Sequence, residues 1–263
     1  MTENNLFEEI TKIFEKVTEV LSKTPNVSEA GKAFLHAFEG GAIASFMNSS
    51  KFEIHVGGPR ASNLVTIFDK SSISSLGNPR WFARVDMPHV NVPFHHINVN
   101  PAITGLPDPH LPISAAVAKA SGFAGSAINT LNKASPILVA ISAIIQIIEI
   151  IISVIKDFNF GTSRNTVKTI IVILFATIGG VGGSLAGAVV GTQIWPGIGT
   201  LIGGILGGVF GSAGLGHISD DTCDLIMDYF KYDIHVALCK KCDKFFDDHR
   251  YLKGAQDKCD QCR

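Results

Sequence analysis

The chain has 263 residues, a formal net charge of −1 and 17% charged residues, so no excess of positive charge indicates a nucleic-acid partner. The mean hydropathy is +0.29 and 26 residues are glycine, which together favour a membrane-associated chain. The first residues, MTENNLFEEITKIFEKVTEVL, are acidic and amphipathic and lack the basic and apolar regions of a signal peptide. We therefore expect no secretion signal here.

Two helices are predicted before residue 49. Apolar residues recur at spacings of three and four over residues 2–24, which is the period of a helix with one buried stripe. Ser28 suits a helix N-cap, and residues 29–48 are predicted to form a second helix.

The hydrophobic period changes to two after residue 50. The segments KFEIHV, SNLVTIFD, RWFARVDM and FHHINVN alternate and are separated by turn residues, which predicts a small antiparallel sheet. The following segment, NPAITGLPDPHLPIS, holds four prolines. We expect no regular structure in it and place a domain boundary there.

A strongly apolar region follows this boundary. Residues 135–158 are predicted to form a helix with Pro136 in its first turn. Glu149 near its middle leaves three placements open: at a membrane interface, inside a helical bundle, or in a span with Glu149 facing protein. The 48 residues from Thr169 to Gly216 carry no charge, whereas roughly 20 apolar residues suffice for one crossing. Two crossings therefore fit.

Glycines recur at every fourth position in this uncharged run. One series is Gly179, Gly183, Gly187 and Gly191, and the other is Gly199, Gly203, Gly207 and Gly211. Each glycine weakens a helix in water by about 1 kcal/mol relative to alanine, but lipid enforces the helix and small residues let two backbones approach closely. Between the series, TQIWPG offers Trp195 for a membrane interface and a tight turn.

We predict a helical hairpin over residues 168–192 and 198–216, with its glycine faces turned toward each other or toward neighbouring copies. It resembles the glycine-zipper hairpins found in many otherwise unrelated membrane proteins, which implies close helix packing without specifying a function. We expect a lipid bilayer as partner and self-association through the zipper. An even number of spans would leave both flanks in the cytosol, where Lys156, Arg164 and Lys168 precede the hairpin. A third span at residues 135–158 would put the N-terminal and C-terminal modules on opposite sides.

Four of the five cysteines form two CxxC pairs near the C-terminal end: Cys239, Cys242, Cys259 and Cys262. This spacing is typical of a structural zinc site with four thiolate ligands, which favours a reducing compartment. A redox or disulfide pairing is the alternative. The segment resembles zinc ribbons, so Zn2+ is the expected cofactor. Cys223 is expected in a helix that begins at Ser219.

Histidines gather in the predicted sheet. If RWFARVDM and FHHINVN pair as a hairpin, Arg84, Asp86, His96 and Asn98 come within reach of one another, with His89 in the connecting loop. Such a set could carry out acid–base chemistry on a phosphodiester. Its RxDxPH…HIN pattern resembles histidine-bearing modules of polymorphic toxins. The alternatives are a solvated sheet face and a metal site that uses His95, His96 or His110.

The sequence thus predicts an α+β protein with four regions: helices at 1–49, a histidine-rich β module at 50–112, an apolar helical region at 113–218, and a helix with a four-cysteine module at 219–263. The leading interpretation is a non-enzymatic membrane protein with cytosolic modules. A pore-forming effector and a membrane-tethered hydrolase or nuclease are the alternatives.

Overall fold

The computed structural model describes residues 29–58, 60–229, 236–238 and 245–247. The helix predicted over residues 2–24 and its neighbour Ser28 lie outside this part of the chain. In chain order the elements are α2 (Glu29–Lys51), β1 (Phe52–Val56), β2 (Asn63–Ile73), β3 (Pro79–Asp86), β4 (His96–Val99), α3 (Pro101–Thr104), β5 (Leu111–Pro112), α4 (Ala115–Phe160), α5 (Arg164–Ile194), α6 (Ile198–Tyr229), β6 (Val236–Leu238) and β7 (Phe245–Asp247).

The α+β class predicted from the sequence is confirmed. The five strands β1 to β5 form one antiparallel sheet in chain order, and β6 pairs with β7 in a separate two-stranded sheet. All four predicted strands are present in the larger sheet. Its apolar face holds buried aliphatic residues such as Ile67, Val85 and Ile97, and these pack in one cluster with Ala118 and Ile128 of α4.

The proline-rich segment is more regular than predicted. Asn100 accepts a hydrogen bond from the backbone N–H of Ala102 and caps the short helix α3, in which Pro101 occupies the first turn. Leu111 then pairs with Ile97, which makes β5 the edge strand. Pro101 and Pro112 are tolerated because they stand at a helix start and on a sheet edge, and Pro107 and Pro109 lie in the irregular loop between them.

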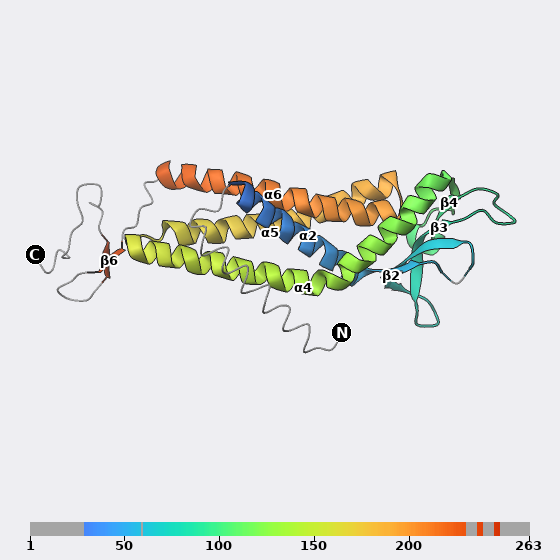
Figure 1. The fold of residues 1–263 in the computed structure, drawn as a ribbon, viewed down its shortest axis with the longest axis horizontal. Coiled ribbons are helices and arrows are strands. Elements are labelled where there is room, and N and C mark those ends of the chain that lie inside the picture. The colour runs from blue at the N-terminus through green and yellow to red at the C-terminus, as the bar shows by residue number, and fades with distance from the viewer. Residues whose placement is uncertain (1–28, 59, 230–235, 239–244, 248–263) are drawn as a thin grey trace, which may run out of the picture.

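The helix α4 runs without a break through Pro136, which the sequence had placed at a helix start. Its N-cap is Ser114, whose hydroxyl accepts from the N–H of Val117. Pro136 has no N–H for the carbonyl of Asn132, and the hydroxyl of Ser135 donates to that carbonyl instead, at 2.7 Å. Figure 1 shows α4 bent along its length, and Pro136 is its interior proline.

The predicted hairpin is present as α5 and α6, and both helices extend beyond the predicted limits. The second helix continues through Ser219, so Ser219 does not start a new helix; its hydroxyl donates to the carbonyl of Gly216. Cys223 is buried in the same helix.

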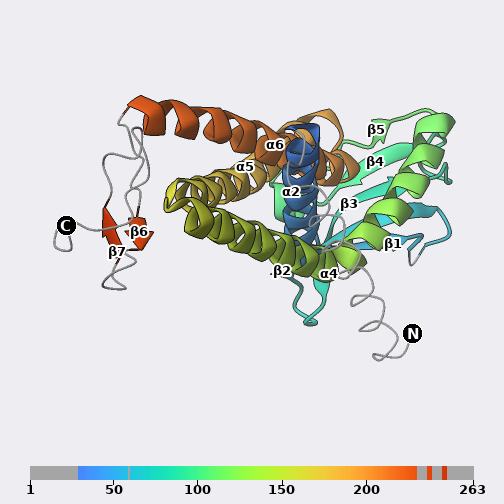
Figure 2. The ribbon, with the colours of Figure 1, turned by 60° about the vertical axis from the view of Figure 1, so that its left-hand side comes forward.

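The turn between α5 and α6 is seated on the sheet. A side chain at Gly197 would approach Ile67 Cδ1 to 3.0 Å, and Ile198 and Leu201 belong to the core cluster of the sheet. Trp195, which the sequence offered for a membrane interface, packs against this cluster as well. Figures 1 and 2 show the sheet at one end of the helical bundle, and α6 ends at the other.

Candidate functional site

The two glycine series face each other along the α5–α6 interface. The pairs are Gly179 with Gly211, Gly183 with Gly207, Gly187 with Gly203, and Gly191 with Gly199; a Cβ added at any of these glycines would overlap the backbone of its partner. The sequence left open whether these faces meet within the hairpin or between copies. They meet within the hairpin.

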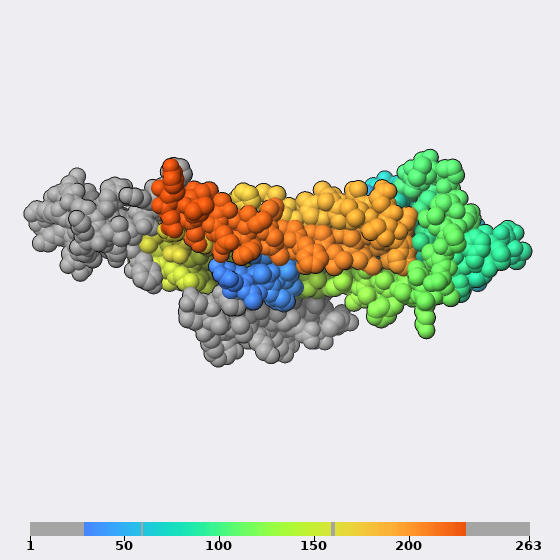
Figure 3. All heavy atoms as spheres, turned by 90° about the horizontal axis from the view of Figure 1, so that it is seen from above, coloured from blue at the N-terminus to red at the C-terminus, as the bar shows by residue number. Residues whose placement is uncertain are grey.

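Helix α2 packs along a second stripe of small residues on α6. Gly40 lies against Gly208, where a Cβ on Gly208 would stand 2.7 Å from the Gly40 carbonyl oxygen, and Gly216 lies against the ring of His36. Figure 3 shows α2 and α6 side by side on one face. This contact was not predicted from the sequence, although His36, Gly40, Ala44 and Asn48 recur at every fourth position of α2.

The outer faces of α5 and α6 carry large apolar side chains that nothing in the described chain covers. Val189 is 64% exposed, Ile194 80% and Phe210 70%. The helices α4, α5 and α6 are long and apolar enough to cross a membrane. Small residues therefore face inward and aliphatic residues face outward, as expected for helices in lipid. This arrangement indicates membrane association.

Some of the polar groups inside the bundle form hydrogen bonds between helices. The hydroxyl of Thr177 in α5 donates to Glu39 of α2 at 2.6 Å, and Asn48 donates to the carbonyl of Leu201 at 3.1 Å. Glu149 lines a small cavity between α2 and α4 together with His36 and Glu39. Glu149 thus faces protein, which fits both a helix inside a bundle and a membrane span whose Glu149 faces protein.

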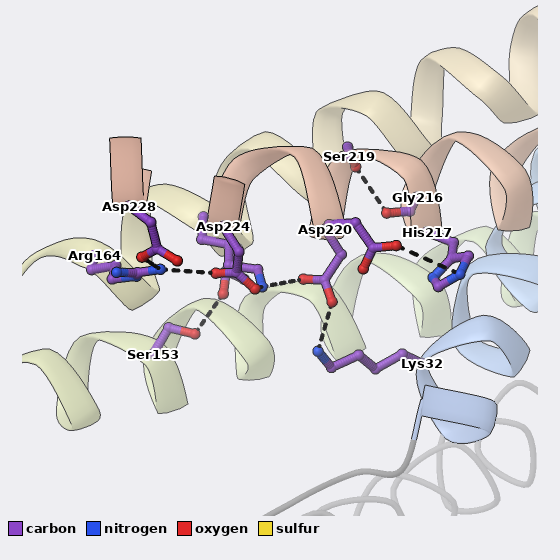
Figure 4. Close-up of polar contacts among 12 residues, drawn as sticks. Lys32, Ser153, Arg164, Gly216, His217, Ser219, Asp220, Asp224 and Asp228 are labelled. Atoms are coloured by element: carbon purple, nitrogen blue, oxygen red, sulfur yellow. Dashed lines mark hydrogen bonds and ion pairs between the residues drawn. The ribbon is translucent and has the colours of Figure 1, made fainter. Parts of the chain in front are cut away.

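Charged side chains join the ends of α2, α5 and α6 that lie away from the sheet (Figure 4). Lys168 pairs with Asp220 at 2.8 Å and also with Asp224, and Arg164 pairs with Asp228 at 2.7 Å. Lys32 of α2 reaches Asp220 at 3.0 Å. The residues of α5 and α6 in this group flank the uncharged run, so the charges gather where the bundle would leave the hydrocarbon layer.

The histidine-rich cluster lies on the sheet face opposite the helices, where β3 pairs with β4. Arg84 stands opposite Asn98 and Asp86 opposite His96. The Nε of Arg84 donates to both carboxylate oxygens of Asp86, at 3.0 and 2.8 Å, and Asn98 donates to Asp86 Oδ2 at 2.7 Å. The structure thus brings together the four strand residues that alternation had grouped.

His96 is fully buried at the centre of this cluster. Its Nδ1 lies 2.8 Å from the carbonyl oxygen of Phe94, and its Nε2 has no hydrogen-bond partner. Asp86 Oδ2 lies 3.9 Å from Nε2. The loop residue His89 meets the His96 ring edge-on at 5.2 Å, and His110 stacks on it at the same centroid distance.

This burial limits what the cluster can do chemically. Asp86, His96 and Asn98 are each at most 1% exposed, and the Nε of Arg84 is bound to Asp86 instead of pointing outward. A phosphodiester has no access to His96 in this arrangement. The catalytic role of Arg84, Asp86, His89, His96 and Asn98 therefore stays a prediction. The four CxxC cysteines lie outside the described residues.

Two family models match the chain, one over the sheet region and one over the helical hairpin. Residues 35–131 match the family model of the C13G5.2-like N-terminal domain, and residues 159–218 match that of the C13G5.2-like glycine zipper domain. The first match contains the sheet and the part of α4 that packs on it, and the second contains the paired glycines. The two matches follow one another along the chain in this order.

Two relatives come from Caenorhabditis elegans. Uncharacterized protein C13G5.2 is 47% identical over 135 residues, which is 51% of this chain and 38% of the relative. Uncharacterized protein C06E1.11 is 42% identical over 134 residues, or 51% of this chain and 57% of the relative. The matches therefore span less than two thirds of either relative. No solved structure matches the chain. The resemblances to zinc ribbons and toxin modules stay predictions.

Proposed function

We propose that this protein is an integral membrane protein in which a glycine-packed bundle of α2, α4, α5 and α6 anchors the histidine-rich sheet at one membrane surface. The single observation that carries the proposal is the division of α5 and α6 into an inner glycine face and an outer aliphatic face. Water would penalise such an exposed apolar surface, whereas lipid solvates it.

The lengths of the helices support this placement. The uncharged part of α5 contains 26 residues, from Thr169 to Ile194, and that of α6 contains 19, from Ile198 to Gly216. At 1.5 Å per residue these segments are about 39 and 28 Å long, close to the roughly 30 Å of a bilayer core. Helix α2 accompanies them as a fourth helix, and its buried Glu39 faces Thr177 instead of lipid.

A bundle that crosses the membrane puts the sheet and the far end of α6 on opposite sides, because the sheet is seated on the α5–α6 turn. We propose this topology in place of the one expected from two spans, in which both flanks of the hairpin lie in the cytosol. We propose that the end of the bundle away from the sheet faces the cytosol, because the cationic residues Arg164 and Lys168 lie there.

Self-association through the glycine zipper, and a pore built from it, receive less support than the anchor. The eight zipper glycines are occupied inside one chain, so contacts between copies would have to use the aliphatic faces. We also propose that Cys239, Cys242, Cys259 and Cys262 bind one structural Zn2+, which rests on their spacing. Zinc analysis of reduced wild-type protein and the Cys239→Ser variant tests it.

Two measurements test the anchor. Membranes that contain the full chain are extracted with alkaline carbonate, and the protein should stay in the pellet; release into the soluble fraction would refute integral insertion. For the topology, an epitope is inserted beside the exposed Leu76 in the β2–β3 turn, and a second one is placed at the C-terminal end. In sealed vesicles only one epitope should bind antibody before permeabilisation.

A further inference from the structure

We propose that Asp86, His89 and His96 form a binding site for one divalent transition-metal ion, distinct from the four cysteines and independent of the membrane anchor. One oxygen or nitrogen from each of the three side chains can be chosen so that these atoms all lie within 4.8 Å of one another. Asp86 ends β3, His96 begins β4 directly opposite, and His89 lies in the loop that joins them. A β-hairpin thus supplies all three ligands.

The orientation of His96 is what the binding of a metal requires. A carbonyl oxygen can only accept a hydrogen bond, so Nδ1 of His96 carries the proton that it donates to Phe94. The other ring nitrogen, Nε2, has no hydrogen-bond partner and lies 3.9 Å from Asp86 Oδ2, so it is available as a ligand. Metal-bound histidines commonly donate their other N–H to a backbone carbonyl in this way.

A cation would satisfy a buried polar atom in the cluster. Nε2 of His96 is buried without a hydrogen-bond partner, and its 3.9 Å separation from Asp86 Oδ2 is too long for a direct hydrogen bond. Zn–N and Zn–O bonds of about 2.0–2.2 Å place neighbouring ligands of a tetrahedral ion roughly 3.4 Å apart. Small side-chain rotations would therefore close the site around an ion.

The surrounding residues hold the ligands in place. Asn98 and Arg84 fix the carboxylate of Asp86 through hydrogen bonds, and the guanidinium of Arg84 lies over the Trp81 ring at 4.9 Å. The ring of His110 stacks on His96 and shields it from solvent. Two imidazoles and one carboxylate suit zinc and other divalent transition ions better than magnesium or calcium. Three protein ligands leave a fourth position for water or another ligand.

The charge of Arg84 sets a limit on affinity, because a guanidinium close to Asp86 repels a second cation. We therefore expect Arg84→Gln, which removes this charge and keeps a donor for Asp86, to bind Zn2+ more tightly than the wild type. This expectation separates a metal site from a purely structural ion pair, for which loss of Arg84 would bring no gain in metal binding.

The experiment measures zinc bound to the full chain in detergent, after removal of metals under reducing conditions and titration with Zn2+. The wild type should bind one equivalent more than His96→Gln, and His89→Ala should lose the same equivalent. His89 is only partly buried, so its variant should keep the fold, which circular dichroism verifies. The control is His55→Ala, an exposed residue that pairs with Glu53 and should bind as much zinc as the wild type.

Cobalt distinguishes this site from the cysteines. Bound Co2+ at Asp86, His89 and His96 should lack the thiolate charge-transfer absorption that a cysteine site shows, and Cys239→Ser should leave it unchanged. Equal zinc stoichiometry in the wild type, His96→Gln and His89→Ala would overturn the proposal. A loss of zinc confined to the Cys239→Ser variant would overturn it equally.

Discussion

Gly183 of α5 and Gly207 of α6 approach so closely that a Cβ on either would overlap the carbonyl of the other. The same relation holds for three further glycine pairs, each displaced by four residues along both helices. Beyond the Gly179–Gly211 pair, Lys168 lies between Asp220 and Asp224 in the same antiparallel register. One helix alignment therefore serves both the apolar packing and the charged end.

The first prediction concerns this packing. Gly183→Ala should lower the free energy of unfolding in detergent by about 2 kcal/mol or more, because a methyl group must push two backbones apart. Gly182→Ala is the matched control, since nothing lies within 4 Å of a Cβ at that position. It should be neutral or stabilising by up to about 1 kcal/mol, which is the gain in helix propensity. Equal stability of the two variants would contradict the observed interface.

The second prediction concerns the docking of α2. Gly40→Val should separate α2 from α6, because Gly208 and Ser212 leave no room for a side chain at Gly40. A zero-length carbodiimide cross-link between Lys32 and Asp220, which lie 3.0 Å apart, reports the docking by mass spectrometry. Its yield should fall several-fold in the variant. Phe34→Val, at a residue that is 69% exposed, should leave the yield unchanged.

The third prediction concerns the start of α5. Asp157, from the end of α4, accepts hydrogen bonds from the backbone N–H groups of Asn165 and Thr166 at 3.0 and 2.7 Å. Asp157 thereby caps α5, because the side chain of the N-cap residue Ser163 forms no capping hydrogen bond. Asp157→Ala should cost about 1–2 kcal/mol of stability, measured by thermal unfolding. Asp221→Ala, with an exposed carboxylate, should cost much less.

The fourth prediction concerns the charged end of the bundle. Lys168→Gln should lower stability by about 1 kcal/mol at low salt, since Lys168 bridges Asp220 and Asp224, which are partly exposed. The difference from wild type should shrink at high ionic strength because salt screens the pairs. Unfolding curves at two salt concentrations decide this. A loss of stability that is the same at both salt concentrations would show that packing of the aliphatic part of the Lys168 side chain dominates.

Much of the fold could be predicted because its local signals agree with the tertiary structure. The period-two segments became strands, and residues 29–48 became α2. The glycine series predicted the hairpin, because in lipid only a partner backbone explains an unbroken row of small residues. The continuous α4 was missed because Pro136 normally marks a helix start, and local patterns do not show that the hydroxyl of Ser135 donates to the Asn132 carbonyl that Pro136 leaves without a backbone donor.

Relations between distant segments could not be predicted from local patterns. Gly197 packs on Ile67 and Ala83, which lie more than a hundred positions away in the chain. No periodicity in the sequence predicts this contact. For the candidate site, strand alternation grouped Arg84, Asp86, His96 and Asn98, which the structure brings together. The burial of His96 and the stacking of His110 depend on loops whose paths the sequence leaves open.

The seating of the hairpin turn in the core of the sheet has a consequence for biogenesis. Ile198 and Leu201 complete the apolar cluster that begins with Phe52 and Ile54. During synthesis the strands emerge long before these two residues exist, so the core of the sheet stays incomplete until α6 has been made. Insertion of the helices and maturation of the sheet are therefore coupled, and a chain truncated before Ile198 should accumulate as a protease-sensitive species.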